Sequence, residues 1–150
     1  VAMSFGTVEH YRYPERLDIC RAHMKLLKPG GVCIISTPNI LFLPHEILKA
    51  GLMMKNKWFL GYEGSFSPVE LRKVGRKLGL RDMKVIGSSW RADFMRYVMI
   101  VRETSTYRRL FNFVEKDAGS SNNLISQKHH WLDDFLGHDI VLIGVKGDSN

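Results

Sequence analysis

The sequence is poor in cysteine and has no long apolar run, and both absences restrict the kind of protein it can be. Its two cysteines, Cys20 and Cys33, form no Cys-x-x-Cys pair, so neither a disulfide framework nor a zinc site is indicated. No apolar stretch reaches the roughly 18 to 20 residues that cross a bilayer, and the N-terminus lacks the basic start and apolar core of a signal peptide. We therefore expect a soluble protein in a reducing cytoplasm.

Acidic residues are outnumbered, with 15 Asp and Glu against 22 Lys and Arg, which gives a net charge of +7. This charge would favour nucleic acid, anionic lipid or an acidic substrate as a partner. The basic residues are scattered, however, and the group at 72–77 falls opposite the apolar stripe of its own predicted helix. A solvated helix face explains them, and we do not expect nucleic acid as the main partner.

The run 26–39 contains the clearest structural signal. A helical pattern that begins near Pro14 is stopped by Pro29 and two glycines, and the apolar strand 32–37 follows at once. Because this strand is apolar throughout, it is predicted to be buried on both faces of a parallel sheet. In an α/β sheet ligands bind at the carboxyl ends of the strands, so the segments 4–10 and 37–39 are the places to look for a site.

The second half of the chain predicts further elements of the same architecture. Ser67-Pro68-Val69-Glu70 is a capping box that begins a helix, which Gly79 ends before a strand at 83–86. We expect a partly helical insert at 40–61 that lies over the strand ends. The remaining predictions are a helix within 90–116, whose face would hold Tyr107, Leu110, Phe111 and Val114, a loop at 117–128, a short helix at 131–136 closed by Gly137, and a final strand at 139–145.

Four blocks, in this order, resemble class I S-adenosylmethionine-dependent methyltransferases, and among them the small-molecule group that includes the ubiquinone-biosynthesis O-methyltransferases. Met3-Ser4-Phe5-Gly6-Thr7-Val8-Glu9-His10 resembles the family's fourth strand and its Glu-His loop. The run 26–39 resembles the fourth helix, the Lys-Pro-Gly-Gly turn and the fifth strand. Residues 66–71 with 78–80 resemble the last large helix and its glycine turn, and 139–146 resembles the closing antiparallel strand.

The resemblance implies an α/β, Rossmann-like methyltransferase fold, of which this chain is the C-terminal portion with parallel strands and a final antiparallel strand. Residues 1–150 would be the C-terminal part of a single methyltransferase domain that starts within the fourth strand, with an insert or lid at about 40–65. The family's acidic and Gly-rich loop after its first strand, and the acidic residue that holds the ribose, have no counterpart here. The missing N-terminal half would carry them, so the fragment alone should be inactive.

The same resemblance implies few site residues. Ser4, Phe5 and Gly6 match positions that flank S-adenosylmethionine, although Phe5 could instead be a core aromatic. His10 could act as the base that deprotonates an acceptor, or it could orient its loop through hydrogen bonds. In some relatives a Glu three residues before the Glu-His pair completes a metal site, and Gly6 stands there, so we expect no metal. The other histidines considered, His45, His129 and His130, are predicted to lie on the surface.

The resemblance implies a methyl transfer from S-adenosylmethionine to oxygen, nitrogen or carbon of a small acceptor. In relatives the region 40–61 builds the acceptor pocket and, in the quinone enzymes, a surface that touches the membrane. A lid and a peripheral membrane contact are therefore both open for this segment. The alternatives for the whole chain are a tRNA or other nucleic-acid methyltransferase, and a degenerate half-domain that acts as a binding module without catalysis.

Overall fold

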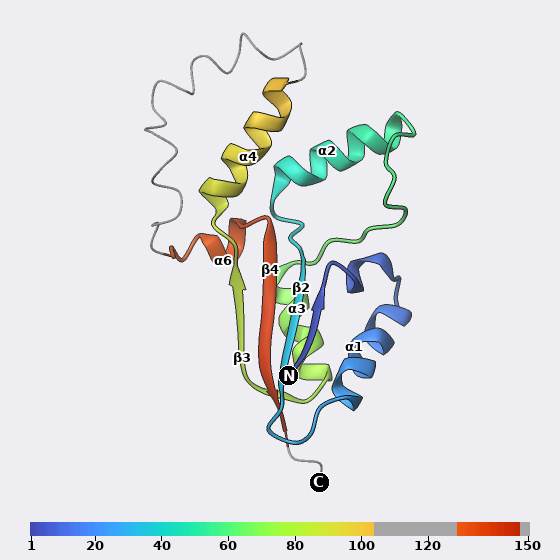
Figure 1. Cartoon of the computed structure of the whole chain (residues 1–150), viewed down its shortest axis with the longest axis vertical. Coiled ribbons are helices and arrows are strands. Elements are labelled where there is room, and N and C mark those ends of the chain that lie inside the picture. Colours follow the sequence, from blue (N-terminus) through green and yellow to red (C-terminus); the bar gives the residue numbers. More distant parts are fainter. Residues whose placement is uncertain (104–128, 148–150) are drawn as a thin grey trace.

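A mixed four-stranded sheet organises the molecule, whose computed structural model describes residues 1–103 and 129–147. The strand order is β1-β2-β4-β3, with β1 parallel to β2 and with β4 antiparallel to both of its neighbours (Figure 1). The predicted α/β architecture with a final antiparallel strand is confirmed. The elements in chain order are β1 (Ala2–Phe5), η1 (Val8–His10), α1 (Glu15–Lys25), β2 (Val32–Pro38), α2 (Leu43–Met54), α3 (Pro68–Lys77), β3 (Leu80–Gly87), α4 (Trp90–Glu103), α6 (Asp133–Leu136) and β4 (Asp139–Lys146).

The turn between α1 and β2 is closed by the far end of the chain. Gly30 adopts a left-handed backbone with φ of 76°, and its N–H donates to the carbonyl of Lys146 at 3.0 Å. The Lys146 ammonium donates to the carbonyls of Met24 and Leu27 at 2.9 and 2.6 Å. A cation at the carboxyl end of a helix satisfies free carbonyls and complements the helix dipole, so Lys146 fastens α1 to the sheet.

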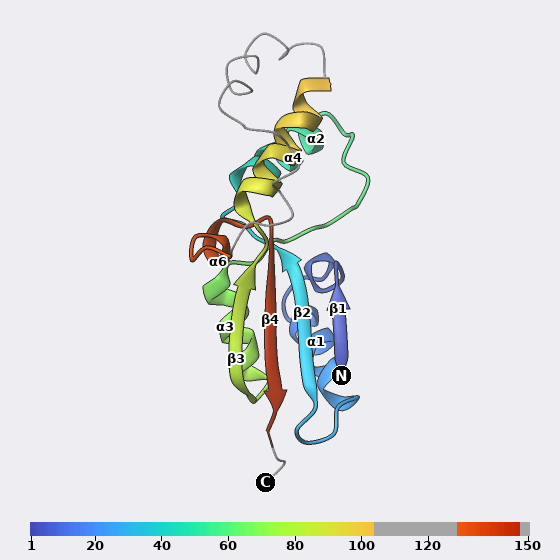
Figure 2. The ribbon, with the colours of Figure 1, turned by 60° about the vertical axis from the view of Figure 1, so that its left-hand side comes forward.

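One face of the sheet forms the core. The side chains of β2 that point to this face are Cys33, Ile35 and Thr37, all buried, and Ile35 is paired in register with Leu142 of β4. Both α1 and α3 pack onto this face (Figure 2). The helical residues of the core are Leu17, Cys20 and Met24 from α1, and Leu71 and Val74 from α3.

The prediction that β2 is buried on both faces is wrong for the described residues. Its alternate side chains, Val32, Ile34 and Ser36, are only half-buried, and beside them Met3 and Phe5 of β1 are 57% and 62% exposed. The sequence pattern shows that both faces of this strand are apolar, but the helices described here cover only one. The second face is therefore an apolar surface that is partly open to solvent.

Helix α3 begins as its sequence predicts. The hydroxyl of Ser67 accepts the N–H of Glu70 at 3.1 Å, Pro68 is the first helical residue, and Gly79 has a left-handed φ of 69° where the chain turns into β3. The Glu70 carboxylate contacts Arg16 at 3.4 Å. The short helix before Gly137 and the final strand are also confirmed, as α6 and β4.

Two helices lie beyond the carboxyl ends of β1 and β2 and contact each other (Figure 1). The first, α2, belongs to the segment 40–61 that was expected to be partly helical. The second, α4, occupies the start of the predicted helix at 90–116; the rest of that prediction, with its face at Tyr107, Leu110, Phe111 and Val114, and the loop 117–128 lie outside the described residues. The chain returns from α2 to the sheet at Phe66, which pairs with Asn39.

Candidate functional site

The loop after β1 lies at the carboxyl end of the strand, where the sequence predicts a site. Gly6 has a left-handed φ of 61°, a conformation that side-chain-bearing residues rarely adopt, and it turns the chain from β1 into η1. Ser4 is buried on the core side of the strand, whereas Phe5 points away from the core. Within the described part of the chain Phe5 does not belong to the core, because 62% of it is exposed.

Two buried polar atoms in this loop have no hydrogen-bond partner among the described residues. They are the hydroxyl of Ser4 and the Oε2 atom of Glu9, which is only 2% exposed. Burial raises the pKa of Glu9; a backbone hydrogen bond and the charge of His10 oppose this rise, and the carboxylates of Glu63 and Asp139 add a smaller rise. The loop therefore holds unused hydrogen-bonding capacity at the sheet edge.

His10 is attached to the segment that returns from α2. Its Nδ1 atom lies 2.9 Å from the carbonyl oxygen of Tyr62, and since a carbonyl only accepts, Nδ1 must carry the proton. In the neutral ring this leaves the lone pair on Nε2. The Gly64 N–H donates to the Glu9 carbonyl at 2.9 Å, so the segment 62–64 runs along the loop. These bonds support the interpretation that His10 orients the loop, and its role as a base stays a prediction.

Arg16 of α1 holds the loop after β1 and the segment 62–64 together. This residue is 5% exposed, donates to the carbonyls of Tyr11 and Gly64 at 3.0 and 2.8 Å, and lies 4.2 Å from the ring centroid of Phe66. It therefore joins the start of α1 to the segment that crosses above the sheet. The position of the loop after β1 depends on this buried cation.

A second polar cluster stands beside this loop, and the sequence did not predict it. His45 of α2 was expected on the surface but is only 8% exposed, and this expectation is wrong; His129 and His130 are exposed as expected. The Nδ1 atom of His45 lies 2.7 Å from the Tyr97 hydroxyl of α4, and its Nε2 atom lies 2.7 Å from Oε1 of Glu63. A buried imidazole between a phenol and a carboxylate is a group placed for proton transfer.

The cluster continues to the start of β4. The Tyr97 hydroxyl also lies 2.9 Å from Nε2 of His138, whose Nδ1 atom lies 3.1 Å from Oδ2 of Asp139. Burial raises the pKa of Tyr97 to about 12, helped by the charges of Asp139, Glu63 and Asp93. For His138 burial acts to lower the pKa, but the hydrogen bond and charge of Asp139, with the charge of Asp93, raise it overall.

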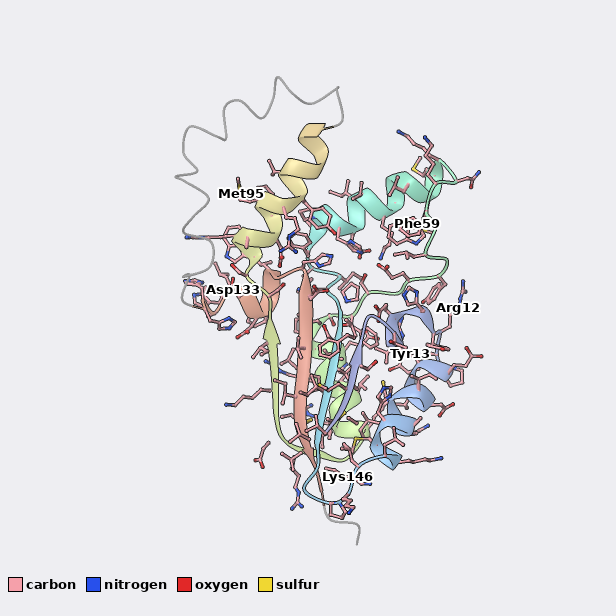
Figure 3. All side chains as sticks on the ribbon, viewed as in Figure 1. Arg12, Tyr13, Phe59, Met95, Asp133 and Lys146 are labelled. Atoms are coloured by element: carbon pink, nitrogen blue, oxygen red, sulfur yellow. The ribbon has the colours of Figure 1, made fainter. Side chains whose placement is uncertain are left out.

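Packing and further ionic contacts enclose the cluster. Side chains lie between α2 and α4 (Figure 3). In the same view Met95 marks α4, and Phe59 marks the segment that follows α2. The Phe42 ring makes edge contacts with Tyr97 and His138, with centroid distances of 5.2 and 5.4 Å. Beneath α2 the buried Lys49 ammonium donates to Glu46 and to Ser65 at 2.8 and 3.0 Å.

Asn39, which ends the predicted Thr-Pro-Asn loop, is used to hold this edge together. It is fully buried, its amide nitrogen donates to the carbonyls of Phe135 and Gly137 at 2.7 and 2.9 Å, and its backbone N–H donates to the carbonyl of His138 at 2.8 Å. A residue with these bonds is a positioning residue for His138 rather than a free ligand-binding group.

One sequence signal could have indicated the second cluster. His45 and Lys49 are one turn apart in α2, so they share one helix face, and Glu46 lies beside them. A polar face on a helix otherwise rich in Leu, Ile and Met points to a buried network. Within residues 1–103 and 129–147, no group of three or more His, Cys, Asp and Glu side chains is arranged to hold a metal ion.

Comparison with known proteins identifies the fold of this chain and nothing finer. No protein-family model and no curated protein sequence matches the chain. A SAM-dependent methyltransferase from Thermotoga maritima has a TM-score of 0.52 and 18% identity, over 96% of this chain and 54% of that one. A SAM-dependent methyltransferase from Archaeoglobus fulgidus has a TM-score of 0.47 and 18% identity, over 96% of this chain and 57% of that one. The small RNA methyltransferase HEN1 has a TM-score of 0.49 and 13% identity, over 99% of this chain and 14% of that one.

The chain spans between 14% and 57% of the length of these solved structures. At such identities the likeness establishes the fold alone, and the Thermotoga structure carries it. The fold is the Rossmann-like fold of methyltransferases, as the sequence resemblance implied. In the described residues, no helix has the length and apolarity that crossing a membrane would require.

Proposed function

We propose that this chain forms part of an S-adenosylmethionine-dependent methyltransferase that acts on a small-molecule acceptor. The observation that carries the proposal is the position of the Ser4–His10 block. It follows a parallel strand at the carboxyl edge of a sheet with a closing antiparallel strand, and its sequence resembles the corresponding loop of class I methyltransferases. Ligands of such sheets bind at this edge.

The residues present fit one wall of a cofactor site. Phe5 offers an exposed aromatic face, and Gly6 lets the backbone approach a ligand closely. Ser4, whose hydroxyl has no partner among the described residues, points to the opposite face of β1, so it could contribute only from the core side. The acidic and Gly-rich loops that would hold the rest of the cofactor have no counterpart in the sequence. When bound, S-adenosylmethionine supplies a methyl group on a positively charged sulfur, and this chain's part is to orient it.

Calorimetric titration of S-adenosylmethionine into the protein as its gene encodes it tests this assignment. We expect Phe5→Ala to weaken binding about tenfold, because an aromatic contact is lost. Met3→Ala is the matched control, since Met3 is 57% exposed on the same face of β1 and lies further from the carboxyl end. Equal affinities for wild type and Phe5→Ala would remove the Phe5 assignment.

The acceptor class is tested with radiolabelled S-adenosylmethionine and a panel of small phenols, catechols and amines, beside a transfer RNA. Label on the small compounds supports the proposal. Label on the RNA alone, with affinity that falls steeply as salt rises, would establish the nucleic-acid alternative instead. Cofactor binding without transfer to any acceptor would favour a non-catalytic binding module.

We further propose that residues 1–150 are the C-terminal part of a single methyltransferase domain. The half-open face of β2 and the edge of β1, which no described strand pairs with, support this, because proteins normally cover an apolar face and a bare strand edge. A preceding segment that adds strands beside β1 would cover both. By itself, the fragment 1–150 should bind S-adenosylmethionine weakly, which a calorimetric titration of the fragment tests, and should transfer no methyl group, which the radiolabelled acceptor panel tests.

The segment 40–61 is also a proposed membrane contact. The apolar side chains of α2 and its following loop are exposed at Leu43, Ile47, Met54 and Phe59, with Lys55 and Lys57 between them. Such a mixed patch suits the interface of an anionic membrane. In sedimentation with vesicles of phosphatidylserine and phosphatidylcholine, wild type should pellet with the vesicles and Phe59→Ser should stay in the supernatant. If the segment is a lid without membrane contact, both proteins should stay in the supernatant.

The two buried free thiols, Cys20 and Cys33, support a cytoplasmic location.

A further inference from the structure

We propose that Glu63, His45, Tyr97, His138 and Asp139 form a proton relay that takes up the proton released when the acceptor is methylated. The catalytic role of the relay rests on the proposed function. The existence of a proton-sharing network among these residues does not depend on it. Its members come from α2, the segment after it, α4, the residue before β4 and the first residue of β4, and they meet only in the folded chain. We refer to these five residues as the relay.

A count of protons shows what the relay can hold. Four contacts join its five groups in a row: Glu63 to His45, His45 to Tyr97, Tyr97 to His138, and His138 to Asp139. Each hydrogen bond needs one proton. Two carboxylates supply none, the phenol supplies one, and two neutral imidazoles supply one each. The row is therefore one proton short when both imidazoles are neutral, and it is complete after accepting one more.

The extra proton has two equivalent positions. When it is on His138, that ring donates to Asp139 and to the Tyr97 oxygen, and Tyr97 donates to His45. When it is on His45, that ring donates to Glu63 and to the Tyr97 oxygen, and Tyr97 donates to His138. In both arrangements all four bonds are complete. The Tyr97 hydroxyl can therefore pass a proton between two rings that are not bonded to each other, which makes it the central residue of the relay.

The relay is placed where a proton would be released. The segment 62–64 that carries Glu63 also bonds to His10 and to the Glu9 backbone, so the buried end of the relay adjoins the loop after β1. The other end, Asp139, has a side chain that is 47% exposed and can exchange protons with water. The other charged groups that face the relay are Glu9 of η1, Glu46 and Lys49 of α2, and Asp93 and Arg96 of α4.

The proton balance of the reaction is simple. The acceptor atom shares a lone pair with the methyl carbon to form the new bond, and the electron pair of the broken carbon–sulfur bond stays on sulfur. When the acceptor O–H or N–H bond then breaks, its electron pair stays on the acceptor atom. One proton is set free in each turnover. When the relay is one proton short, an imidazole lone pair accepts it, and it leaves through His138 and Asp139 to solvent before the next turnover.

Nitrogen-15 NMR of the histidine rings tests the relay without cofactor or acceptor. In wild type we expect the His45 and His138 pair to take up two protons in separate steps, with the first shared by both rings, because the one imidazole lone pair in the complete relay already accepts the Tyr97 proton. Tyr97→Phe should bring the two steps together. Tyr11→Phe, which changes a tyrosine outside the relay, is the control. Independent titration of both rings in wild type, or no effect of Tyr97→Phe in a folded variant, would overturn the relay.

The catalytic role is tested by the pH profile of methyl transfer with whichever acceptor the panel identifies. We expect Tyr97→Phe to lower kcat about 100-fold with an unchanged KM for S-adenosylmethionine, and to remove the limb of the profile that follows the relay's first titration step. An unchanged profile would make the relay purely structural and overturn its role. If no acceptor reacts, that role falls with the proposed function, while the NMR titration still decides whether the relay exists.

Discussion

The loop Ser4–His10 and the relay lie at the same edge of the sheet, yet they satisfy their polar groups in opposite ways. The loop leaves the Ser4 hydroxyl and one Glu9 oxygen without a partner among the described residues. The relay, in contrast, joins every imidazole nitrogen of His45 and His138 to a neighbour. This difference indicates that the loop is arranged to contact something outside itself, whereas the relay is arranged to hold and move a proton internally.

The largest effect is expected when the relay loses its buried carboxylate. Glu63→Ala would leave His45 and Lys49 without the negative charge that lies 2.7 and 3.6 Å from them. Lys49 keeps its contact with Glu46 at 2.8 Å, so the main cost is the buried imidazole nitrogen of His45 that loses its partner, and we expect a loss of about 1 to 3 kcal/mol in the free energy of unfolding. Urea denaturation at pH 7 measures it.

The exposed Glu15, at the first turn of α1, provides the matched control for that change. Glu15→Ala should alter the free energy of unfolding by no more than about 0.5 kcal/mol. If both variants lost the same small amount, Glu63 would behave as a surface residue, and the contrast between a satisfied relay and an unsatisfied loop would not hold.

The opposite sign is expected for the buried carboxylate of the loop. Glu9→Gln removes a charge whose burial is only partly compensated, so the variant should be more stable than wild type at pH 7, by on the order of 1 kcal/mol. Thermal unfolding of the two proteins, compared at the same pH, measures the difference. A clear loss of stability would mean that the Glu9 carboxylate has a favourable partner after all.

The pH dependence gives this comparison a second signature. Because the pKa of Glu9 is raised on folding, the folded chain binds more protons than the unfolded one above about 4.5, the ordinary value. Stability therefore falls as pH rises from 4.5 through the folded pKa and is level beyond it. The advantage of Glu9→Gln should be largest at pH 7 and should disappear toward pH 4.5.

A smaller effect is expected at the exposed end of the relay. The pKa of His138 is also raised on folding, so its contribution to stability is complete below about 6.5 and is lost as pH rises through the folded value. Asp139→Asn removes the main group that raises it. We expect a loss of at most about 1 kcal/mol below pH 6.5 that vanishes in alkali, because Asp139 is half exposed. Unfolding curves from pH 5 to 9 would show it, and a loss that did not change with pH would contradict it.

The smallest effect is expected from Phe5→Ala. Its ring is 62% exposed, so the free energy of unfolding should change by less than about 0.5 kcal/mol, even though we propose that S-adenosylmethionine binding weakens. The same variant preparation serves both measurements. A large loss of stability would show that Phe5 is structural and would explain any loss of binding without a contact to the cofactor.

Elements whose causes are local were predictable from the sequence. The Ser67 cap, the Gly79 turn and the strand after Gly31 each depend on neighbours within a few positions, and all three are present. The full burial of β2 was not correctly predicted, because its alternating apolar residues show what a face can bury and not what covers it. The relay was missed since His45, Tyr97 and His138 are joined only by the fold, at separations of 52 and 41 residues.

The central position of β4 has a consequence for how the chain folds during its synthesis. Strands β2 and β3 do not pair with each other, and each is bonded to β4, the last element of the described chain. Among the described strands, β3 therefore has none to join during synthesis until residues 139–146 have left the ribosome, and His138 cannot reach Tyr97 before then. Strands β1 and β2 can pair earlier, but β3 should join the sheet late, together with β4 and with the formation of the relay.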